Sequence, residues 1–379
     1  MELSWARGID LPPTHREKAA LMLGEPRLLA LATAVPEHVL HQEDVRERAA
    51  ILFSEERERF QRLLPVYANA GIDRRYSCVP IEWYLEAHGW RERSELFVKH
   101  ATDLLARASL DCLARAGLGV EEVDAIVAVS TSGVTTPSLD ALLMERLGMR
   151  RELRRLPIFG LGCVGGVLGL ARASELARSY PGERVLFLVV ELCGITFRRG
   201  DHSKSNLIAT ALFGDGAAAA LIACEGSGPA FLASGEYTWP DSLEVMGWRV
   251  RDDGLGVLFS RDIPALVRSD YRAAAERFLE REGLTLEDIG EFLCHPGGAK
   301  VLTALEACLE LEQGSLHHSR EVLRQYGNMS AATVLFVLER ALANGGLPRR
   351  SLMTSLGPGF TAGFLLLGND GAAAREGAA

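Results

Sequence analysis

The stretch Phe159-Gly-Leu-Gly-Cys163-Val-Gly-Gly166 places a cysteine on a glycine-rich turn, directly before an apolar helical run over 167–176. Glycines in such a turn let another molecule approach the backbone, and the turn can direct amide groups at a reacting carbonyl. The partial positive charge at a helix N-terminus lowers the pKa of a thiol. Most cysteines are instead small buried core residues. The turn makes Cys163 a candidate nucleophile.

The landmarks around this turn occur a second time further along the chain. Tyr326-Gly-Asn328-Met-Ser-Ala331 opens an apolar helical run over 331–342, as the cysteine turn does in the first half. Three landmarks that recur in the same order are typical of a duplicated chain. The other repeated landmarks are glycines before a strand (Gly117 and Gly283) and glycine turns that enter a small-residue strand (after Phe213 and after Leu356).

Short β-branched runs alternate with helical stretches between these landmarks. This alternation favours an α/β fold with buried sheets. We expect one body of two related halves, with 1–228 carrying the cysteine and 229–379 carrying a histidine and an asparagine. The expected helices are 98–116, 167–176, 299–309 and 331–342, and the expected strands are 123–130, 186–190 and 217–223.

Composition excludes several classes of protein. The 379 residues carry a net charge of −9, which gives no electrostatic footprint for nucleic acid or an anionic membrane surface. No apolar run reaches the length of about 18 residues that a membrane-spanning helix needs, and the N-terminus has no signal-peptide pattern. The seven cysteines are never spaced C-x-x-C, so we expect reduced thiols, a cytoplasmic location and no metal site.

His295 and Asn328 complete the candidate site. His295 lies between an apolar run and the turn Pro296-Gly-Gly298, and Asn328 opens a helical run. The alternatives are a hydrogen-bonded loop histidine and an N-cap asparagine, a frequent role for that residue. Cysteine with histidine is an activated-nucleophile pair. Two neutral donors aimed at one oxygen would stabilise an enolate or a tetrahedral oxyanion.

Over residues 25–370 the sequence resembles type III polyketide synthases, the chalcone-synthase-like enzymes of the thiolase superfamily. Ketoacyl-ACP synthase III shares the Cys-His-Asn set but follows its histidine with Gln-Ala-Asn. The resemblance implies a five-layered αβαβα thiolase-like fold and a homodimer. It rests on the cysteine and asparagine stretches quoted above together with Ala211-Leu-Phe213-Gly-Asp-Gly-Ala-Ala-Ala, His295-Pro-Gly-Gly and Leu356-Gly-Pro-Gly359-Phe.

The resemblance also implies a mechanism. Cys163 takes an acyl group from a coenzyme A thioester and forms a thiolate–imidazolium pair with His295. His295 and Asn328 hold the thioester oxygen of malonyl-CoA while it loses CO2, and the enolate attacks the bound acyl group. Coenzyme A thioesters are then the substrates, and no metal or redox cofactor is implied.

Further residues match family positions around the active site. Phe213 matches the gatekeeper aromatic, although a core phenylalanine is the plainer interpretation. Arg59, Arg62 and Lys300 match basic residues that hold the phosphates of coenzyme A, with a solvated helix face as the alternative. The positions that match the cavity lining are Thr131, Thr196, Trp248, Val257, Ser330 and Leu356.

The product class is suggested by finer similarities. The segments 69–80 and 245–248 resemble bacterial alkylresorcinol and alkylpyrone synthases, which use fatty acyl starters. We therefore expect an acyl-CoA starter, extension with malonyl-CoA and closure to a pyrone or a resorcinol. The alternatives are a single condensation with an acyl carrier protein, as in ketoacyl-ACP synthase III, and a non-catalytic thiolase-like scaffold. A papain-like protease also uses Cys, His and Asn, but the mid-chain position of Cys163 in a duplicated body argues against it.

Overall fold

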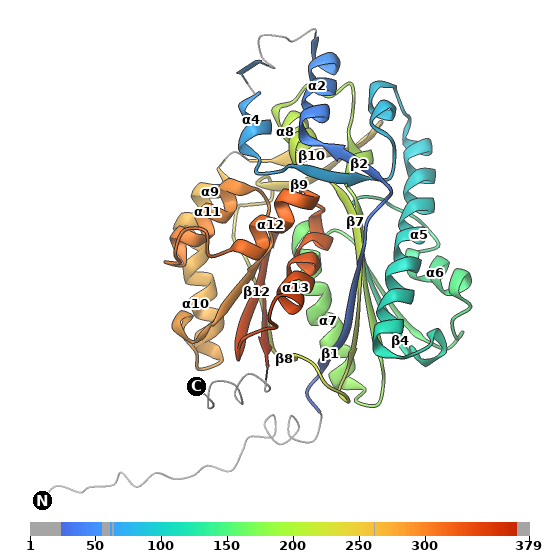
Figure 1. Cartoon of the computed structure of the whole chain (residues 1–379), viewed down its shortest axis with the longest axis vertical. Helices are drawn as coiled ribbons and strands as arrows, with labels where there is room; N and C mark the ends of the chain where they lie inside the picture. Colours follow the sequence, from blue (N-terminus) through green and yellow to red (C-terminus); the bar gives the residue numbers. More distant parts are fainter. Residues whose placement is uncertain (1–23, 55–60, 63, 261, 370–379) are drawn as a thin grey trace, which may run out of the picture.

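One mixed β-sheet runs through the protein in the computed structural model, which describes residues 24–54, 61–62, 64–260 and 262–369. Its nine strands lie in the order β11-β12-β13-β8-β1-β7-β6-β4-β5 (Figure 1). The strands are β1 (Arg27–Ala34), β4 (Ala125–Val129), β5 (Arg154–Ile158), β6 (Val185–Leu192), β7 (Asp215–Ala223), β8 (Ala230–Thr238), β11 (Glu291–Cys294), β12 (Arg350–Gly357) and β13 (Thr361–Gly368).

The two halves of the sheet repeat one topology. In the first half, β1 is antiparallel to β7, β7 is antiparallel to β6, and β6 is parallel to β4. In the second half, β8, β13, β12 and β11 pair with the same sequence of directions. Arg27 of β1 and Ala230 of β8 join the halves. The predicted duplication is therefore confirmed, and β5 extends the first half alone.

Helices form three layers around the two half-sheets (Figure 1). The central helices α7 and α13 share one apolar core with residues of both half-sheets. Helices α5 and α6 pack on the outer face of the first half, and α10 and α11 pack on that of the second. The five-layered thiolase-like architecture is confirmed. The bounds of these helices are α5 (Trp90–Ala116), α6 (Leu139–Leu147), α7 (Gly165–Ser179), α10 (Arg272–Arg281), α11 (Ala299–Cys308) and α13 (Thr333–Ala343).

Smaller elements gather at one end of the body (Figure 1). A two-stranded antiparallel sheet, β2–β3, and a hairpin, β9–β10, lie there beside helices α2, α4 and α8. These elements and two further helices are β2 (His38–His41), β3 (Arg74–Ser77), β9 (Met246–Arg251), β10 (Gly254–Phe259), α2 (Gln42–Leu52), α4 (Pro65–Asn69), α8 (Lys204–Leu212), α9 (Ile263–Leu266) and α12 (His317–Tyr326).

The sequence located the elements well but missed some of their ends. Helix α5 ends as expected at Gly117, whose φ of 70° suits glycine, but it begins at Trp90 rather than at residue 98. Residues 91–95 near its start are all polar, so apolar spacing does not show this part of the helix. The helix expected from residue 331 begins with a 3₁₀ turn, Ser330–Ala332, before α13. None of the helices in the described ranges combines the length and apolar composition that crossing a membrane requires.

The central layer depends on a close approach at Gly166. A Cβ atom at Gly166 would lie 2.2 Å from the carbonyl oxygen of Ala331, which belongs to the backbone before α13. We predict that Gly166→Ala lowers the free energy of unfolding by about 2 kcal/mol or more, since an overpacked core must shift its backbone. Denaturant unfolding followed by circular dichroism measures this.

The matched control is Gly182→Ala, because a Cβ atom at Gly182 meets no atom within 4 Å. Equal unfolding free energies for the two variants would contradict the role given to Gly166.

Candidate active site

Cys163, His295 and Asn328 line one cavity of about 390 Å³. Cys163 lies in a 3₁₀ turn, Gly162–Val164, directly before α7. His295 follows the last residue of β11, and Asn328 follows α12. Three residues from three elements and from both halves of the chain thus converge on one space, as the sequence predicted that they would.

The turn that carries Cys163 is held from three sides. The backbone N–H of Gly162 donates to Thr131 Oγ1 at 3.0 Å, and Ser355 Oγ donates to the carbonyl oxygen of Cys163 at 2.7 Å. The thiol Sγ lies 3.5 Å from Ser330 Oγ. Gly162 has a φ of 50°, and a Cβ atom there would lie 2.6 Å from Cδ of Pro358, so only glycine fits.

The imidazole of His295 lines the cavity. Its backbone N–H donates to the carbonyl oxygen of Thr354 at 2.8 Å, which fixes the residue at the end of the sheet. The residue is 5% exposed, and among the described residues neither ring nitrogen has a hydrogen-bond partner. A buried polar group in this state needs an explanation, and the interpretation as a hydrogen-bonded loop histidine is wrong. The free ring suits a group that acts on a bound molecule.

The side chain of Asn328 is oriented by its own turn. Its Oδ1 accepts a hydrogen bond from the backbone N–H of Ser330 at 2.8 Å, and its Nδ2 donates to the carbonyl oxygen of Gly297 at 3.2 Å. Ser330 has a φ of 47°, a conformation rarely adopted by residues with a side chain. Asn328 therefore caps the turn that opens α13, and the same contact keeps its amide nitrogen as the donor at the cavity.

Burial controls the protonation of the site. It raises the pKa of the Cys163 thiol to about 12 and lowers the pKa of the His295 imidazole to about 3. The expected lowering of the thiol pKa by the helix N-terminus is thus wrong, because loss of solvent outweighs the helix charge. Burial therefore favours the neutral forms of both groups.

A buried carboxyl group supports the wall behind Cys163. Glu191 accepts hydrogen bonds from the backbone N–H groups of Thr131, at 3.1 Å, and Ser132, at 2.8 Å. Burial raises its pKa to about 7. The expected cavity residues Thr131 and Ser330 therefore surround the cysteine. Thr131 accepts a hydrogen bond from the turn that carries Cys163, and Ser330 contacts the thiol.

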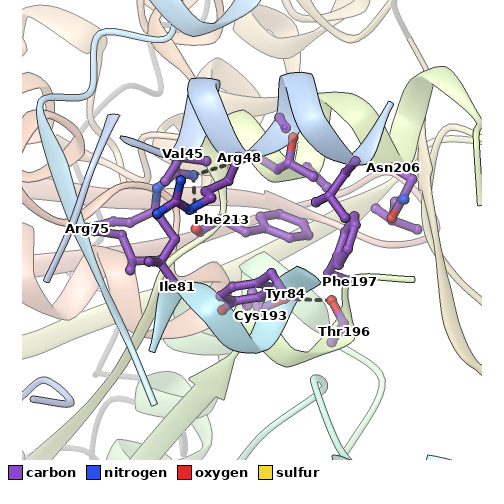
Figure 2. A pocket seen from close by; sticks show the side chains of 17 residues that line it. Val45, Arg48, Arg75, Ile81, Tyr84, Cys193, Thr196, Phe197, Asn206 and Phe213 are labelled. Carbon is purple, nitrogen blue, oxygen red and sulfur yellow. Dashed lines mark hydrogen bonds between the residues drawn. The ribbon is translucent and has the colours of Figure 1, made fainter. Parts of the chain in front are cut away.

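Three expected cavity residues line a separate apolar pocket, not the cavity that contains Cys163. Figure 2 shows Thr196 and Phe213 in this second pocket, which Val257 also lines. Phe213 lies at the boundary, because its ring contacts Phe259, a lining residue of the first cavity, at a centroid distance of 5.6 Å. The ring of Trp248 packs against Phe213 at 6.0 Å. The sequence could not show that an aromatic cluster divides the space in two.

Basic side chains also line the first cavity. Arg62 and Lys300 line it as expected, and so does Leu356. Arg59 lies outside the described residues. Lys204, at the start of α8, joins them and was not anticipated, because nothing in its sequence surroundings separates it from an ordinary surface lysine.

Tyr271 is a second lining residue that the sequence did not reveal. It ends a π-helical turn, Val267–Tyr271, and its hydroxyl lies 2.6 Å from Thr354 Oγ1. Thr354 Oγ1 donates its only hydrogen to the carbonyl oxygen of Gly363, so Tyr271 is the donor of this pair. A one-turn π-helix has no spacing signature that sequence analysis could use.

Comparison with known proteins agrees with this fold and this set of residues. The family described as chalcone and stilbene synthases matches with its N-terminal domain over residues 14–229 and with its C-terminal domain over 232–369. A putative chalcone synthase from Bacillus subtilis is 38% identical over 89% of this chain and 97% of its own length. The 1,3,6,8-tetrahydroxynaphthalene synthase of Streptomyces peucetius is 37% identical over 94% and 96%.

The solved structures lead to the same class. The crystal structure of the tetrahydroxynaphthalene synthase from Streptomyces coelicolor, a bacterial type III polyketide synthase, has a TM-score of 0.86 and 29% identity, and the match covers 90% of this chain and 99% of that one. The fold and the site thus define a condensing enzyme of the thiolase type. The chain belongs to the chalcone and stilbene synthase family, whose members are type III polyketide synthases, that is, decarboxylating condensing acyltransferases.

The free imidazole of His295 yields a prediction about the thiol. We expect His295→Gln to slow alkylation of Cys163 by iodoacetamide at pH 7 about tenfold or more, because glutamine cannot accept the thiol proton. Burial holds the pKa of the unassisted thiol well above 7. The thiolate fraction, and with it the alkylation rate of this variant, should therefore rise about tenfold per pH unit between pH 7 and 9. Mass spectrometry of labelled peptides measures the rate.

His318→Gln is the control, since His318 is 8% exposed and lies outside both cavities. Fast alkylation without pH dependence in His295→Gln would show that the imidazole does not activate the thiol.

Proposed function

We propose that this protein loads a fatty acyl group from an acyl-CoA onto Cys163, extends it with malonyl-CoA and cyclises the chain to an alkylpyrone or an alkylresorcinol. Type III polyketide synthases act on malonyl-CoA and acyl-CoA substrates. The observation that carries the proposal is the convergence of Cys163, His295 and Asn328 on one cavity in a chain of this family.

Loading begins with a proton transfer. The His295 imidazole, which has no other partner among the described residues, takes the proton of Cys163, and Sγ attacks the carbonyl carbon of the acyl-CoA. The carbon–sulfur bond to coenzyme A breaks, and the departing thiolate takes the proton back from the imidazolium. Attraction between thiolate and imidazolium offsets the cost of charging both groups in a buried site.

Extension uses His295 and Asn328 as donors. A ring N–H of neutral His295 and the Nδ2 group of Asn328 donate to the thioester oxygen of malonyl-CoA. The bond to the carboxylate breaks, CO2 leaves, and its electron pair forms an enolate on this oxygen. The enolate carbon attacks the acyl group on Cys163, a carbon–carbon bond forms, and the cysteine thiolate is released. Every step is a proton transfer, an acyl transfer or a decarboxylation, so the scheme calls for no metal or redox cofactor.

Lysine and arginine side chains fit the phosphates of coenzyme A. Arg62, Lys204 and Lys300 lie on three different segments but line the same cavity as Cys163. Cations of this kind bind phosphate by charge and by hydrogen bonding. We assign Arg62 and Lys300 to the coenzyme A end of the substrate, with Arg59 as a family match whose position is outside the described residues, and we add Lys204 to this group.

The second pocket supports a fatty acyl starter. Its lining is mostly apolar and includes Leu40, Val45, Ala49 and Leu52 of the segment that leads into and along α2 (Figure 2). Phe213 borders it on the side of the reaction cavity, through its contact with Phe259, and Val257 also lines it. An alkyl chain that passes the aromatic boundary would be buried there, with a gain of about 0.8 kcal/mol for each CH₂ group removed from water. Thr196 and Trp248 would then shape the passage.

The proposed division of roles can be tested on malonyl-CoA alone. Cys163→Ala should lose product formation at least about a thousandfold, because it cannot hold the acyl group, but should still release CO2 from malonyl-CoA. Asn328→Ala should lose CO2 release about a hundredfold, since it lacks one donor to the enolate. Radiolabelled malonyl-CoA measures CO2 release, and mass spectrometry measures product. Full product formation by folded Cys163→Ala would overturn the proposal.

The starter can be tested by filling the second pocket. Ala209 is 7% exposed and lines it from α8. We expect Ala209→Phe to lower kcat/KM for a twelve-carbon acyl-CoA about tenfold relative to a four-carbon one, because losing room for two CH₂ groups costs about 1.6 kcal/mol. Equal losses for both starters would place the alkyl chain elsewhere.

A second candidate product follows from the similarity to tetrahydroxynaphthalene synthases. Such a product consists of rings and hydroxyl groups and has no alkyl chain, so it needs no fatty acyl starter. Product from malonyl-CoA alone, unchanged when acyl-CoAs are added, would favour it. Products that carry a single added two-carbon unit and depend on an acyl carrier protein would favour the ketoacyl-ACP synthase III-like alternative, and an unreactive Cys163 would favour the scaffold.

We also propose that two copies of the chain associate through strand β5. This strand is the edge of the sheet, and Leu156 in it is 41% exposed. Val134 and Phe159, two further apolar side chains from the neighbouring loops, are 56% and 59% exposed. An uncovered edge strand with apolar neighbours is a template for pairing with another chain.

We predict that Leu156→Glu converts a dimer to a monomer in sedimentation velocity at micromolar concentration, because it places a charge in the apolar interface. Leu110→Glu is the control, since Leu110 is 50% exposed on α5. A monomeric native protein, or an intact dimer in the Leu156 variant, would rule out this interface.

A further inference from the structure

Arg75 is a buried cation that lines the second pocket next to Phe213. It lies on β3 and is 1% exposed. Its Nη1 donates to the carbonyl oxygens of Thr210, at 2.8 Å, and Phe213, at 3.2 Å, and its Nη2 donates to Oε1 of Gln42. These acceptors are neutral, and two of them are backbone groups at the end of α8. Burial lowers the pKa of Arg75 to about 10, although the nearby Asp215 carboxylate favours the charged form, so the position calls for a reason.

Two glycines next to the site let two turns approach each other beside this side chain. A Cβ atom at Gly214 would lie 2.4 Å from the carbonyl oxygen of Tyr326, and one at Gly327 would lie 2.8 Å from that of Leu212. The same two Cβ atoms would lie 3.3 Å and 3.4 Å from Cβ of Arg75.

Gly214 directly follows Phe213, and Gly327 directly precedes Asn328. The stem of Arg75 therefore fills the corner between the turn that carries Phe213 and the turn that carries Asn328. Figure 2 shows its guanidinium group beside Phe213.

The same two turns are bonded to each other. The backbone N–H of Asn328 donates to the carbonyl oxygen of Leu212 at 2.8 Å, and the N–H of Gly214 donates to the carbonyl oxygen of Asn328 at 3.0 Å. Phe213 and Asn328 are thus paired as in a parallel bridge. A shift of the Phe213 turn must move the Asn328 backbone with it, because these two hydrogen bonds join the two turns directly.

We propose that Arg75 is a positioning residue, which holds the paired turns so that Asn328 presents its amide nitrogen to the thioester oxygen and Phe213 keeps its place between the two pockets. This inference rests on the proposed function, since it assigns Asn328 to decarboxylation. Gln42, which accepts a hydrogen bond from Arg75, continues this network: its Nε2 donates to the carbonyl oxygens of Tyr67 and Ala211, both at 3.1 Å. Arginine suits this place because its planar group can donate to several acceptors at once.

The test compares Arg75→Met and Arg75→Lys with the native protein. Methionine keeps much of the stem without donors, and lysine keeps the charge with a single nitrogen. For each variant, CO2 release from malonyl-CoA without starter is divided by the concentration of Cys163 that iodoacetamide titrates. We expect this ratio to fall 10- to 100-fold in Arg75→Met, because a displacement of about 1 Å in a catalytic group can cost a hundredfold. Arg75→Lys should recover part of the loss.

The alkylation rate of Cys163 should stay within about twofold of native in both variants, since the cysteine turn makes none of these bonds. Arg178→Met is the matched control, because Nη2 of Arg178 also donates to a backbone carbonyl oxygen, that of Phe231 at 2.9 Å, away from both cavities. Circular dichroism and thermal melting establish which variants are folded.

The outcomes separate this inference from the proposed function. A native protein that releases no CO2 from malonyl-CoA would contradict the proposed function. A native ratio in folded Arg75→Met would overturn the role of Arg75 alone. Equal decreases in the decarboxylation ratio and in the alkylation rate would show general loosening of the site instead of positioning, and would also overturn it. If Arg75→Met does not fold, Arg75→Lys and Gln42→Leu provide the same comparison.

Discussion

The contact between the two central helices is the constraint on which the rest of this structure depends. Gly166 lets the start of α7 lie against the carbonyl oxygen of Ala331, just before α13. Cys163 lies three residues before Gly166 and Ser330 directly before Ala331, and the side chains of Cys163 and Ser330 meet at 3.5 Å. Even a methyl side chain at Gly166 would push the two halves of the duplicated body apart at the point where Cys163 meets the turn that follows Asn328. The packing of the core therefore also sets the geometry of the site.

Burial also controls which charge states the groups of the site adopt. It disfavours the charged forms of Cys163, His295 and Glu191, and raises or lowers each pKa accordingly. A neutral imidazole can first accept the thiol proton and later donate an N–H to an oxygen, and both tasks need the ring free of other partners. Arg75 is the exception, because burial lowers its pKa only to about 10 and it keeps its charge. The backbone carbonyl oxygens of Thr210 and Phe213 therefore accept hydrogen bonds from a charged side chain that is 1% exposed.

Several parts of the site could be predicted because they are local. Gly160, Gly162 and Gly166 around Cys163, the Pro-Gly-Gly after His295 and the repeat of the turn at Asn328 are short patterns whose conformations follow from the residues themselves. Other parts could not, because they depend on contacts between distant segments. The division of the lining residues between two pockets is made by the rings of Phe213, Phe259 and Trp248, which come from three segments. Tyr271 reaches the cavity through a π-helical turn, which leaves no trace in the spacing of apolar residues.

The sequence by itself determined the α/β class, the duplication, the family and the identity of Cys163, His295 and Asn328 as the reactive candidates. It did so because turns, apolar periodicity and repeated motifs are properties of neighbouring residues. Only the tertiary structure decided the protonation of the cysteine and the histidine, the boundary between the two pockets and the place of Arg75 beneath the paired turns. These features depend on how much water each group loses and on which distant backbone it meets, and both quantities exist only after the chain has folded.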